Sequence, residues 1–189
     1  MKKLFLSFVL VLFSTFSFAQ NTWSIDQMHS SVNFTVEHMG ISFVQGRFDK
    51  FTGSLKTKGN SLDNAVFDIS IHPESINTGV EMRDKHLKSK DFFATEEYSE
   101  IKFTTASISK EKDGSYVFTG KLTIKDVTKE ISVPVILGGI TKNKEGKEIM
   151  GMQAKFSISR FDYGLNYDPT AAGIAKHVEI TTYLELVKR

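Results

Sequence analysis

The sequence predicts an all-β protein: an antiparallel, eight-stranded barrel with a short helical insertion near residues 79–93. Polar and apolar residues alternate along many short segments, which is typical of strands with one buried face. Most of these segments are joined by short polar turns, as in an antiparallel barrel or sandwich. The segment 82–93 follows neither the strand period nor a long helical period. We prefer the barrel to the sandwich, with that segment inserted between two of its strands.

The first nineteen residues are predicted to be a secretory signal peptide rather than part of the fold. Lys2 and Lys3 form a positive start, an apolar stretch follows from Leu4 to Phe13, and Ala19 ends a small-residue cleavage region. The apolar stretch is shorter than the ~18 residues of a membrane-spanning helix. We therefore expect an exported protein without stable membrane insertion, whose single domain occupies residues 20–189.

The composition of residues 20–189 excludes several classes of function. Removal of Lys2 and Lys3 takes the formal charge from +2 to 0, so no basic excess points to nucleic acid. The chain has no cysteine, which rules out disulfides, thiol catalysis and cysteine-bound metals. A domain of this length can form a substantial core without such cross-links.

The first half of the domain supplies several strands in order. Trp23 begins a short one, and residues 31–38 alternate clearly, with His38 ending the apolar row. Residues 43–56 resume the alternation, but its parity changes, which predicts a bulge near Asp49 and Lys50. Gly46 and Gly53 suit sharp bends in a curved sheet. Residues 65–71 form the next strand, which Pro73 ends.

The second half resumes after the insertion with strands expected near 101–105, 116–125, 131–137, 150–158 and 178–186. Asp113-Gly114 is a strong hairpin signal, and residues 143–146 form another polar tip. We expect residues 126–129 to form the turn between two of these strands. Residues 164–173 read as a loop.

If the strands close into a barrel, their apolar rows face its lumen together with the two phenylalanines that end the insertion. Sequence pattern alone does not decide whether such a lumen is filled or holds a small ligand. The expected lumen residues are Val32, Phe34, Val36, Phe48, Phe67, Ile69, Phe92, Phe93, Phe103, Phe118, Leu122, Met152 and Phe156.

Polar residues at the ends of the apolar rows are the candidates for contact with a ligand headgroup. His38 and Arg160 have inward parity, and they would meet the insertion if it folds over the same end. The alternative for Arg160 is a structural partnership with Asp162 or another acid, and for the insertion a solvated surface helix. The headgroup candidates are His38, Arg83, Asp84, His86 and Arg160.

Catalytic and metal-binding motifs are not found. No pair of histidines has close metal-site spacing, and no G-x-S-x-G or phosphate-binding loop occurs. We therefore predict no catalytic residue, no metal and no cofactor. The alternatives are a metal-dependent or hydrolytic enzyme that uses His29, His38, His86 and Asp84, or a structural module with a filled interior.

Five blocks of the sequence resemble YceI-like proteins, in the right order and over essentially the whole domain. They are D-Q-M-H-S-S-V-N-F-T-V-E-H-M-G-I-S (26–42), V-Q-G-R-F-D-K-F-T-G (44–53), R-D-K-H-L-K-S-K-D-F-F (83–93), G-K-L-T-I-K-D-V-T-K (120–129) and S-R-F-D-Y-G (159–164). Asp126 stands where that family usually has glycine, and Trp23 stands where tyrosine is common.

The resemblance implies a lipocalin-like barrel, exported to the periplasm, that binds a polyisoprenoid or a related amphiphilic lipid in its lumen. Isoprenoid quinones and prenyl phosphates are the ligands that it suggests, for carriage, storage or stress protection. It implies no established catalytic activity. A homodimer is a candidate assembly.

Overall fold

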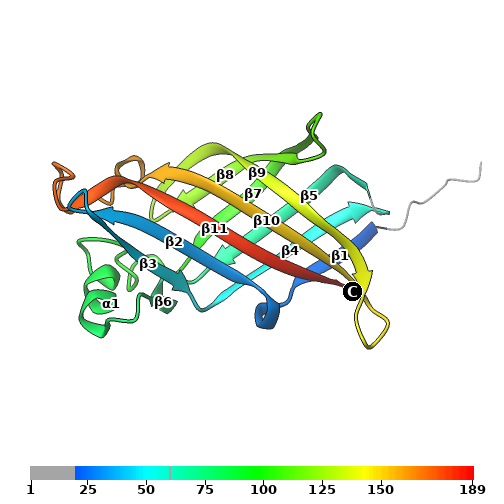
Figure 1. The fold of residues 1–189 in the computed structure, drawn as a ribbon, viewed down its shortest axis with the longest axis horizontal. Helices are drawn as coiled ribbons and strands as arrows, with labels where there is room; N and C mark the ends of the chain where they lie inside the picture. Colours follow the sequence, from blue (N-terminus) through cyan, green and yellow to red (C-terminus); the bar gives the residue numbers. More distant parts are fainter. Residues whose placement is uncertain (1–19, 60) are drawn as a thin grey trace, which may run out of the picture.

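A computed structural model describes residues 20–59 and 61–189, so the predicted signal peptide lies outside the described residues. The domain is an all-antiparallel barrel whose long strands curve around one interior (Figure 1). Its strands are β1 Gln20–Ile25, β2 Ser31–His38, β3 Ser42–Phe48, β4 Phe51–Lys58, β5 Ser61–Ile71, β6 Ile76–Asn77, β7 Ile101–Lys110, β8 Tyr116–Ile124, β9 Val127–Lys142, β10 Glu148–Ser159 and β11 Ile174–Lys188.

The eight-stranded closed barrel predicted from the sequence is confirmed. The ring runs β1-β4-β5-β7-β8-β9-β10-β11, and the pairing of β1 with β11 closes it. The other three strands continue the lines of ring strands toward one end of the barrel. The long strand β11 pairs with β1 along one part and with β2 along another. In the same way β4 pairs with β1 and β3 pairs with β2. Next to them, β5 pairs with β4 and β6 pairs with β3.

The parity change predicted near Asp49 and Lys50 occurs as a break between β3 and β4 rather than as a bulge within one strand. The backbone N–H of Asp49 donates to the carbonyl of Ser75 (3.1 Å), and that of Lys50 donates to the Ser75 hydroxyl (2.9 Å). The two amides therefore leave the ladder and bond to the 3₁₀ turn η2 Pro73–Ser75. Phe48 and Phe51 flank the break and are both buried.

The turn expected at residues 126–129 is tighter than predicted. Ile124 is paired with Val127, so only Lys125 and Asp126 connect β8 to β9. Lys125 takes a left-handed φ of 57°. A two-residue connection lets the ladder begin at Val127, which lengthens β9 at the expense of the predicted turn.

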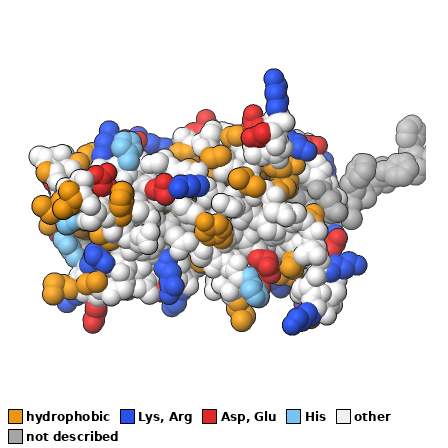
Figure 2. All heavy atoms as spheres, in the orientation of Figure 1, with side chains coloured by type: hydrophobic (Ala, Val, Ile, Leu, Met, Phe, Trp, Pro, Cys, Tyr) orange, Lys and Arg blue, Asp and Glu red, His pale blue; other side chains and the backbone are white. Residues whose placement is uncertain are grey.

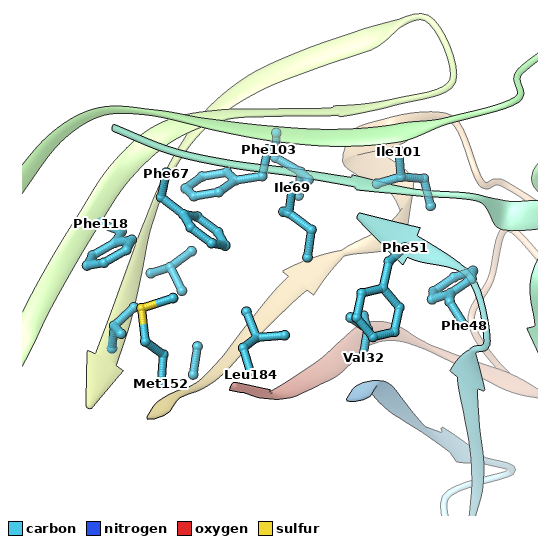
Figure 3. Packing of buried hydrophobic residues seen from close by; sticks show 14 of the residues in the cluster. Val32, Phe48, Phe51, Phe67, Ile69, Ile101, Phe103, Phe118, Met152 and Leu184 are labelled. Carbon is cyan, nitrogen blue, oxygen red and sulfur yellow. The ribbon is translucent and has the colours of Figure 1, made fainter. Parts of the chain in front are cut away.

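The alternation seen in the sequence is the reason that the interior is apolar, because successive Cβ atoms point to opposite faces of a strand. Figure 3 shows these side chains projecting from several strands into the same space. Gly46 lies opposite Phe34 in the β2–β3 ladder, and a Cβ there would collide with the Phe34 ring. Gly46 thus makes room for an aromatic ring on the barrel wall.

One end of the barrel is plugged by its own side chains. Trp23, Leu55 and Leu186 have no exposed surface, and Met150 is 1% exposed. The indole N–H of Trp23 donates to Thr57 Oγ1 (3.3 Å), so its one polar atom is paired inside the plug. This end is sealed by packing and by a buried hydrogen bond.

The opposite end carries the predicted insertion, where α1 spans Glu81–Lys88 and lies beside β6 (Figure 1). Acidic Glu81 and Asp84 lie in its first turn and basic side chains in its last, which suits the helix dipole. The chain then turns so that the Phe93 N–H donates to the Leu87 carbonyl (3.0 Å), and Leu87 packs on the core.

The remaining short helices are η1 Gln27–His29 and η3 Arg160–Tyr163. Within the described chain, none of the helices is long and apolar enough to span a membrane.

Candidate functional site

The barrel encloses a cavity of about 750 Å³. Its volume lies within the ~300–1,000 Å³ of typical small-ligand sites. The interior is therefore hollow rather than filled. All the residues predicted to face the lumen lie in its wall: Val32, Phe34, Val36, Phe48, Phe67, Ile69, Phe92, Phe93, Phe103, Phe118, Leu122, Met152 and Phe156. Their contact with a ligand stays a prediction.

The mouth of the cavity lies at the α1 end, where three segments meet. Glu37 and His38 end β2, Val80 and Met82 begin the insertion, and Tyr167 lies in the loop before β11; all five line the cavity and are exposed. Figure 1 shows the β2–β3 turn, α1 and the loop before β11 together at one end of the barrel. The charged and aromatic polar side chains of Glu37, His38 and Tyr167 thus lie where the cavity meets water.

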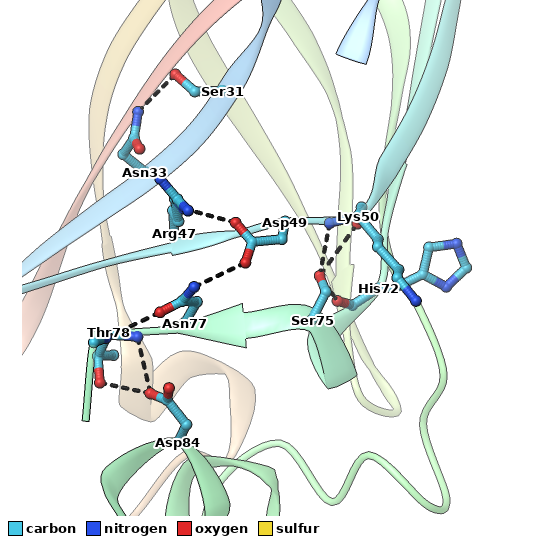
Figure 4. A network of polar contacts seen from close by, with 11 residues as sticks. Ser31, Asn33, Arg47, Asp49, Lys50, His72, Ser75, Asn77, Thr78 and Asp84 are labelled. Atoms are coloured by element: carbon cyan, nitrogen blue, oxygen red, sulfur yellow. Dashed lines mark hydrogen bonds and ion pairs between the residues drawn. The ribbon is translucent and has the colours of Figure 1, made fainter. Parts of the chain in front are cut away.

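Arg83 and Asp84 are neighbours in α1 but have different places in the structure. Arg83 lines the cavity, and it donates through Nε to Thr78 Oγ1 (2.7 Å) and through Nη2 to the Thr78 carbonyl (3.0 Å). Asp84 does not line the cavity: its carboxylate accepts the Thr78 N–H (2.9 Å) and hydroxyl (2.5 Å), as Figure 4 shows. The headgroup role of Asp84 stays a prediction, and in this structure its carboxylate fixes the chain entering α1.

His86 is held at the mouth by one carboxylate and two aromatic rings. Its Nε2 lies 3.0 Å from Asp91 Oδ2, and its ring stands edge-on to Phe92 and Tyr167 at centroid distances of 5.1 and 4.8 Å. Tyr167 therefore connects the loop before β11 to the insertion. Sequence reasoning missed Tyr167, and the only signal available was a single aromatic residue in the loop 164–173.

Arg160 lies in the cavity wall but has no N–H left for a ligand. It is 3% exposed, and its five N–H groups donate to the carbonyls of five loop and strand residues. These are Ala175 (3.0 Å) through Nε, Leu165 (2.7 Å) and Tyr167 (2.5 Å) through Nη1, and Asp168 (3.0 Å) and Ile174 (2.8 Å) through Nη2. The guanidinium has five donors in all. The headgroup role of Arg160 stays a prediction, and these five hydrogen bonds assign the guanidinium to the loop. The alternative prediction, a structural role for Arg160, agrees better with these contacts, although the partners are backbone carbonyls rather than Asp162.

Asp168 completes the same loop, because its carboxylate accepts backbone N–H groups whereas Arg160 donates to carbonyls. Its Oδ2 accepts from the backbone of Gly173 (2.7 Å) and Ile174 (2.8 Å), and its Oδ1 accepts from Thr170 Oγ1 (3.0 Å). The backbone hydrogen bond from Ile174, followed by that from Gly173, lowers the pKa of Asp168 below its ordinary value of 3.8. Arg160 and Asp168 together hold the loop that brings Tyr167 to the mouth.

The lowered pKa of Asp168 predicts an acid-sensitive loop. A carboxyl whose pKa is lower in the folded state contributes stability above its unfolded pKa, and that contribution is lost as the pH falls through the folded value. We therefore expect the amide protection of residues 165–175 to decrease below about pH 4. Hydrogen exchange against pH measures it. The Asp168→Asn variant should lose this pH dependence, whereas Asp162→Asn should keep it; an unchanged profile in Asp168→Asn would contradict the assignment.

The residues of the alternative enzyme hypothesis are not brought together. His29 Nδ1 lies 2.9 Å from Asp26 Oδ2 and 3.6 Å from Glu185 Oε1, and none of these three residues lines the cavity. Among the described residues this trio is the one cluster whose ligand atoms lie close enough to hold a metal ion. The hydrogen bond to Asp26 raises the pKa of His29 above its ordinary 6.5. His38 and His86 lie at the mouth instead, and Asp84 binds Thr78.

A closed antiparallel barrel with a plugged end, an apolar cavity and one polar mouth has the architecture of a lipocalin-like binding protein. The sequence matches the model of the YceI-like domain over residues 23–186. The chain belongs to the YceI-like family, as the sequence blocks indicated.

Relatives of known sequence and structure agree with this assignment. A UPF0312 protein of Staphylococcus aureus strain MSSA476 is 37% identical over 147 residues, which cover 77% of this chain and 83% of that protein. The crystal structure of Campylobacter jejuni YceI protein matches with a TM-score of 0.73 and 28% identity, covering 81% of this chain and 90% of that one.

Two more distant structures share the fold. Burkholderia cenocepacia BcnA has a TM-score of 0.75 at 23% identity, covering 85% of this chain and 98% of its own. A polyisoprenoid binding domain from Saccharophagus degradans has a TM-score of 0.69 at 18% identity, covering 88% and 98%.

Proposed function

We propose that this protein binds a polyisoprenoid or a similar amphiphilic lipid, with the hydrocarbon tail in the barrel and the headgroup at the α1 end. The observation that carries the proposal is the mostly apolar cavity of about 750 Å³ with His38, Arg83 and His86 at its mouth. The name of the Saccharophagus degradans domain, a polyisoprenoid binding domain of the same fold, supports this class of ligand.

The tail supplies most of the binding free energy in this proposal. Each five-carbon isoprene unit that leaves water gains roughly 3–4 kcal/mol, at ~0.8 kcal/mol for each methylene-sized group. Binding also restricts the chain and the protein, so the net gain is smaller. Met152 and the other flexible side chains of the wall adapt to tails of different length.

The headgroup meets the remaining candidates at the mouth. His38, Arg83 and His86 line it, and Arg83 uses only two of its N–H groups on Thr78 within the described structure. A quinone carbonyl or a prenyl phosphate accepts hydrogen bonds from such donors, and an arginine fork suits phosphate well. Isoprenoid quinones and prenyl phosphates are therefore the ligands that we propose.

We further propose that the protein acts by binding rather than by catalysis, for carriage, storage or protection of the lipid. The basic and apolar start of the sequence supports export, with cleavage near Ala19 and a periplasmic location. Protein purified from its own host should carry a bound mass in native mass spectrometry that organic extraction removes. Preparations that are always empty and never take up a prenyl quinone would contradict the proposal.

A large side chain placed in the cavity wall should block binding. Ala154 is buried in the wall, whereas Lys155 follows it on the outer face of β10 and pairs with Glu179 (3.1 Å). We expect Ala154→Trp to weaken prenyl-quinone uptake at least tenfold, because the indole occupies space that two or more methylene groups would fill at ~0.8 kcal/mol each. Ligand titration measures it.

Lys155→Trp is the matched control, since it adds the same ring to the same strand outside the barrel. It should bind as the natural protein does. Circular dichroism checks that both variants keep the barrel. Equal binding by a folded Ala154→Trp variant and the natural protein would show that the ligand does not occupy the cavity.

A further inference from the structure

Exposed apolar side chains surround the mouth of the cavity. They come from the β2–β3 hairpin, the start of α1 and the loop before β11, and we call them the apolar rim. Figure 2 shows hydrophobic side chains gathered at this end of the molecule. The exposed fraction reaches 86% for Ile41, 83% for Met82 and 68% for Phe43. The apolar rim comprises Met39, Ile41, Phe43, Val80, Met82 and Tyr167.

The other large apolar residues with high exposure are spread over the rest of the described chain. Met28 lies in η1, Val66 in β5, Ile136 and Ile140 in β9, and Tyr183 in β11. Single exposed apolar side chains are normal on a protein surface, whereas a contiguous group marks an interaction site. The rim is therefore the apolar surface that requires a partner.

Part of the rim continues into the cavity, beside the polar groups of Arg83 and His86. Val80, Met82 and Tyr167 are exposed at the mouth and also line the cavity. An apolar partner placed against the rim would thus contact side chains that also line the lumen. This continuity favours a partner that exchanges hydrocarbon chains with the cavity, because moving such a chain through water is unfavourable.

The charges beside the rim nearly cancel. The end of β2, α1, the loop before β11 and the first residues of β11 carry four positive and four negative side chains: Arg83, Lys85, Lys88 and Lys176 against Glu37, Glu81, Asp84 and Asp168. Such a balance favours neither a strongly acidic nor a strongly basic partner. The attraction must come from the apolar side chains, as it does for proteins that insert a few residues into the boundary region of a bilayer.

We propose that the apolar rim docks on the surface of a lipid bilayer, so that a lipid moves between the membrane and the cavity without crossing water. This inference rests on the proposed lipid-binding function. Ile41 and Phe43 of the β2–β3 hairpin would enter the bilayer, together with Met82 at the start of α1.

Vesicle flotation with vesicles of phosphatidylethanolamine and phosphatidylglycerol tests the proposal. The Ile41→Ser/Phe43→Thr variant removes two rim side chains that do not line the cavity. The Met28→Ser/Ile136→Thr variant is the matched control, since it removes two exposed apolar side chains elsewhere. We expect the rim variant to bind vesicles at least about tenfold less tightly and the control to bind as the natural protein does. Binding should persist when the salt concentration rises from about 0.1 M to about 1 M.

Uptake of a prenyl quinone from detergent micelles, measured in parallel, separates this proposal from the proposed function. Rim-dependent vesicle binding without any quinone uptake would overturn the lipid-binding function and leave bilayer docking in place. Equal vesicle binding by the folded rim variant, or no vesicle binding by the natural protein, would overturn the docking. A dimer that the rim variant converts to a monomer, with vesicle binding unchanged, would assign the rim to a second copy of this chain instead.

Discussion

Replacement of Arg160 by methionine is expected to destabilise the protein by at least about 3 kcal/mol. Hydrogen bonds from a charged donor contribute roughly 1.5–3 kcal/mol each, although not additively. Arg160 makes five of them, all to backbone carbonyls of residues 165–175. Without the guanidinium these carbonyls lose their partners, and the loop must open to find water. Urea denaturation measures the change in the free energy of unfolding.

Two controls separate the role of the guanidinium from the role of its charge. Arg160→Lys keeps the charge but offers one ammonium in place of a planar fork, so it should lose most of the same stability. Arg47→Met removes an exposed arginine whose Nε lies 2.6 Å from Asp49, and should cost no more than about 1 kcal/mol. Hydrogen exchange should show lost protection at residues 165–175 in both Arg160 variants. Full stability of Arg160→Lys would mean that charge alone is required.

Substitution of Trp23 by alanine is expected to cost about 3–5 kcal/mol, whereas Phe34→Ala should cost only about 1–2 kcal/mol. Truncation of a large aromatic side chain in a packed core removes its burial and leaves a void. Trp23 is fully buried in the plug. Phe34 is only partly buried and faces the cavity, so one side of its ring makes few packing contacts that truncation could remove. Thermal and urea unfolding of the ligand-free protein measure both.

The comparison of these two variants tests the hollow interior directly. Bound prenyl quinone should stabilise the natural protein through mass action, and Phe34→Ala should lose part of that stabilisation. Trp23→Ala should keep it, because Trp23 does not line the cavity. If Phe34→Ala destabilised the empty protein as much as Trp23→Ala, the interior would behave as a solid core and the cavity would not be the ligand site.

Much of the barrel follows from local sequence. The alternation of apolar and polar residues correctly placed Phe67, Phe118 and Met152 inside, because neighbouring side chains on a strand must point to opposite faces. The segment 82–93 lacked that alternation and forms α1 and the turn after it. Errors of detail came where backbone bonds decide the geometry. The bulge expected at Asp49 and Lys50 is a break, and the turn expected at 126–129 is two residues long.

The candidate site was predictable only in part. The inward parity of His38 and the position of the insertion correctly predicted that His38, Arg83 and His86 line one cavity. Parity says which way Arg160 points but not which acceptors it meets, because the carbonyls that surround it come together only when the loop folds. The hydrogen-bond partner of Asp84 was not predictable for the same reason, since Thr78 lies outside the helix. Tyr167 had no periodic signal at all.

The amino-acid sequence by itself determined the strands, the residues that face inward and the position of the inserted helix, because these depend on periodicity along the chain. Only the tertiary structure decided that the interior is hollow, that one end is plugged by Trp23 and that Arg160 donates to five backbone carbonyls. Those properties depend on how eight strands close and how far apart opposite walls stand. Distances of that kind are set by packing between segments remote in sequence, and no local pattern encodes them.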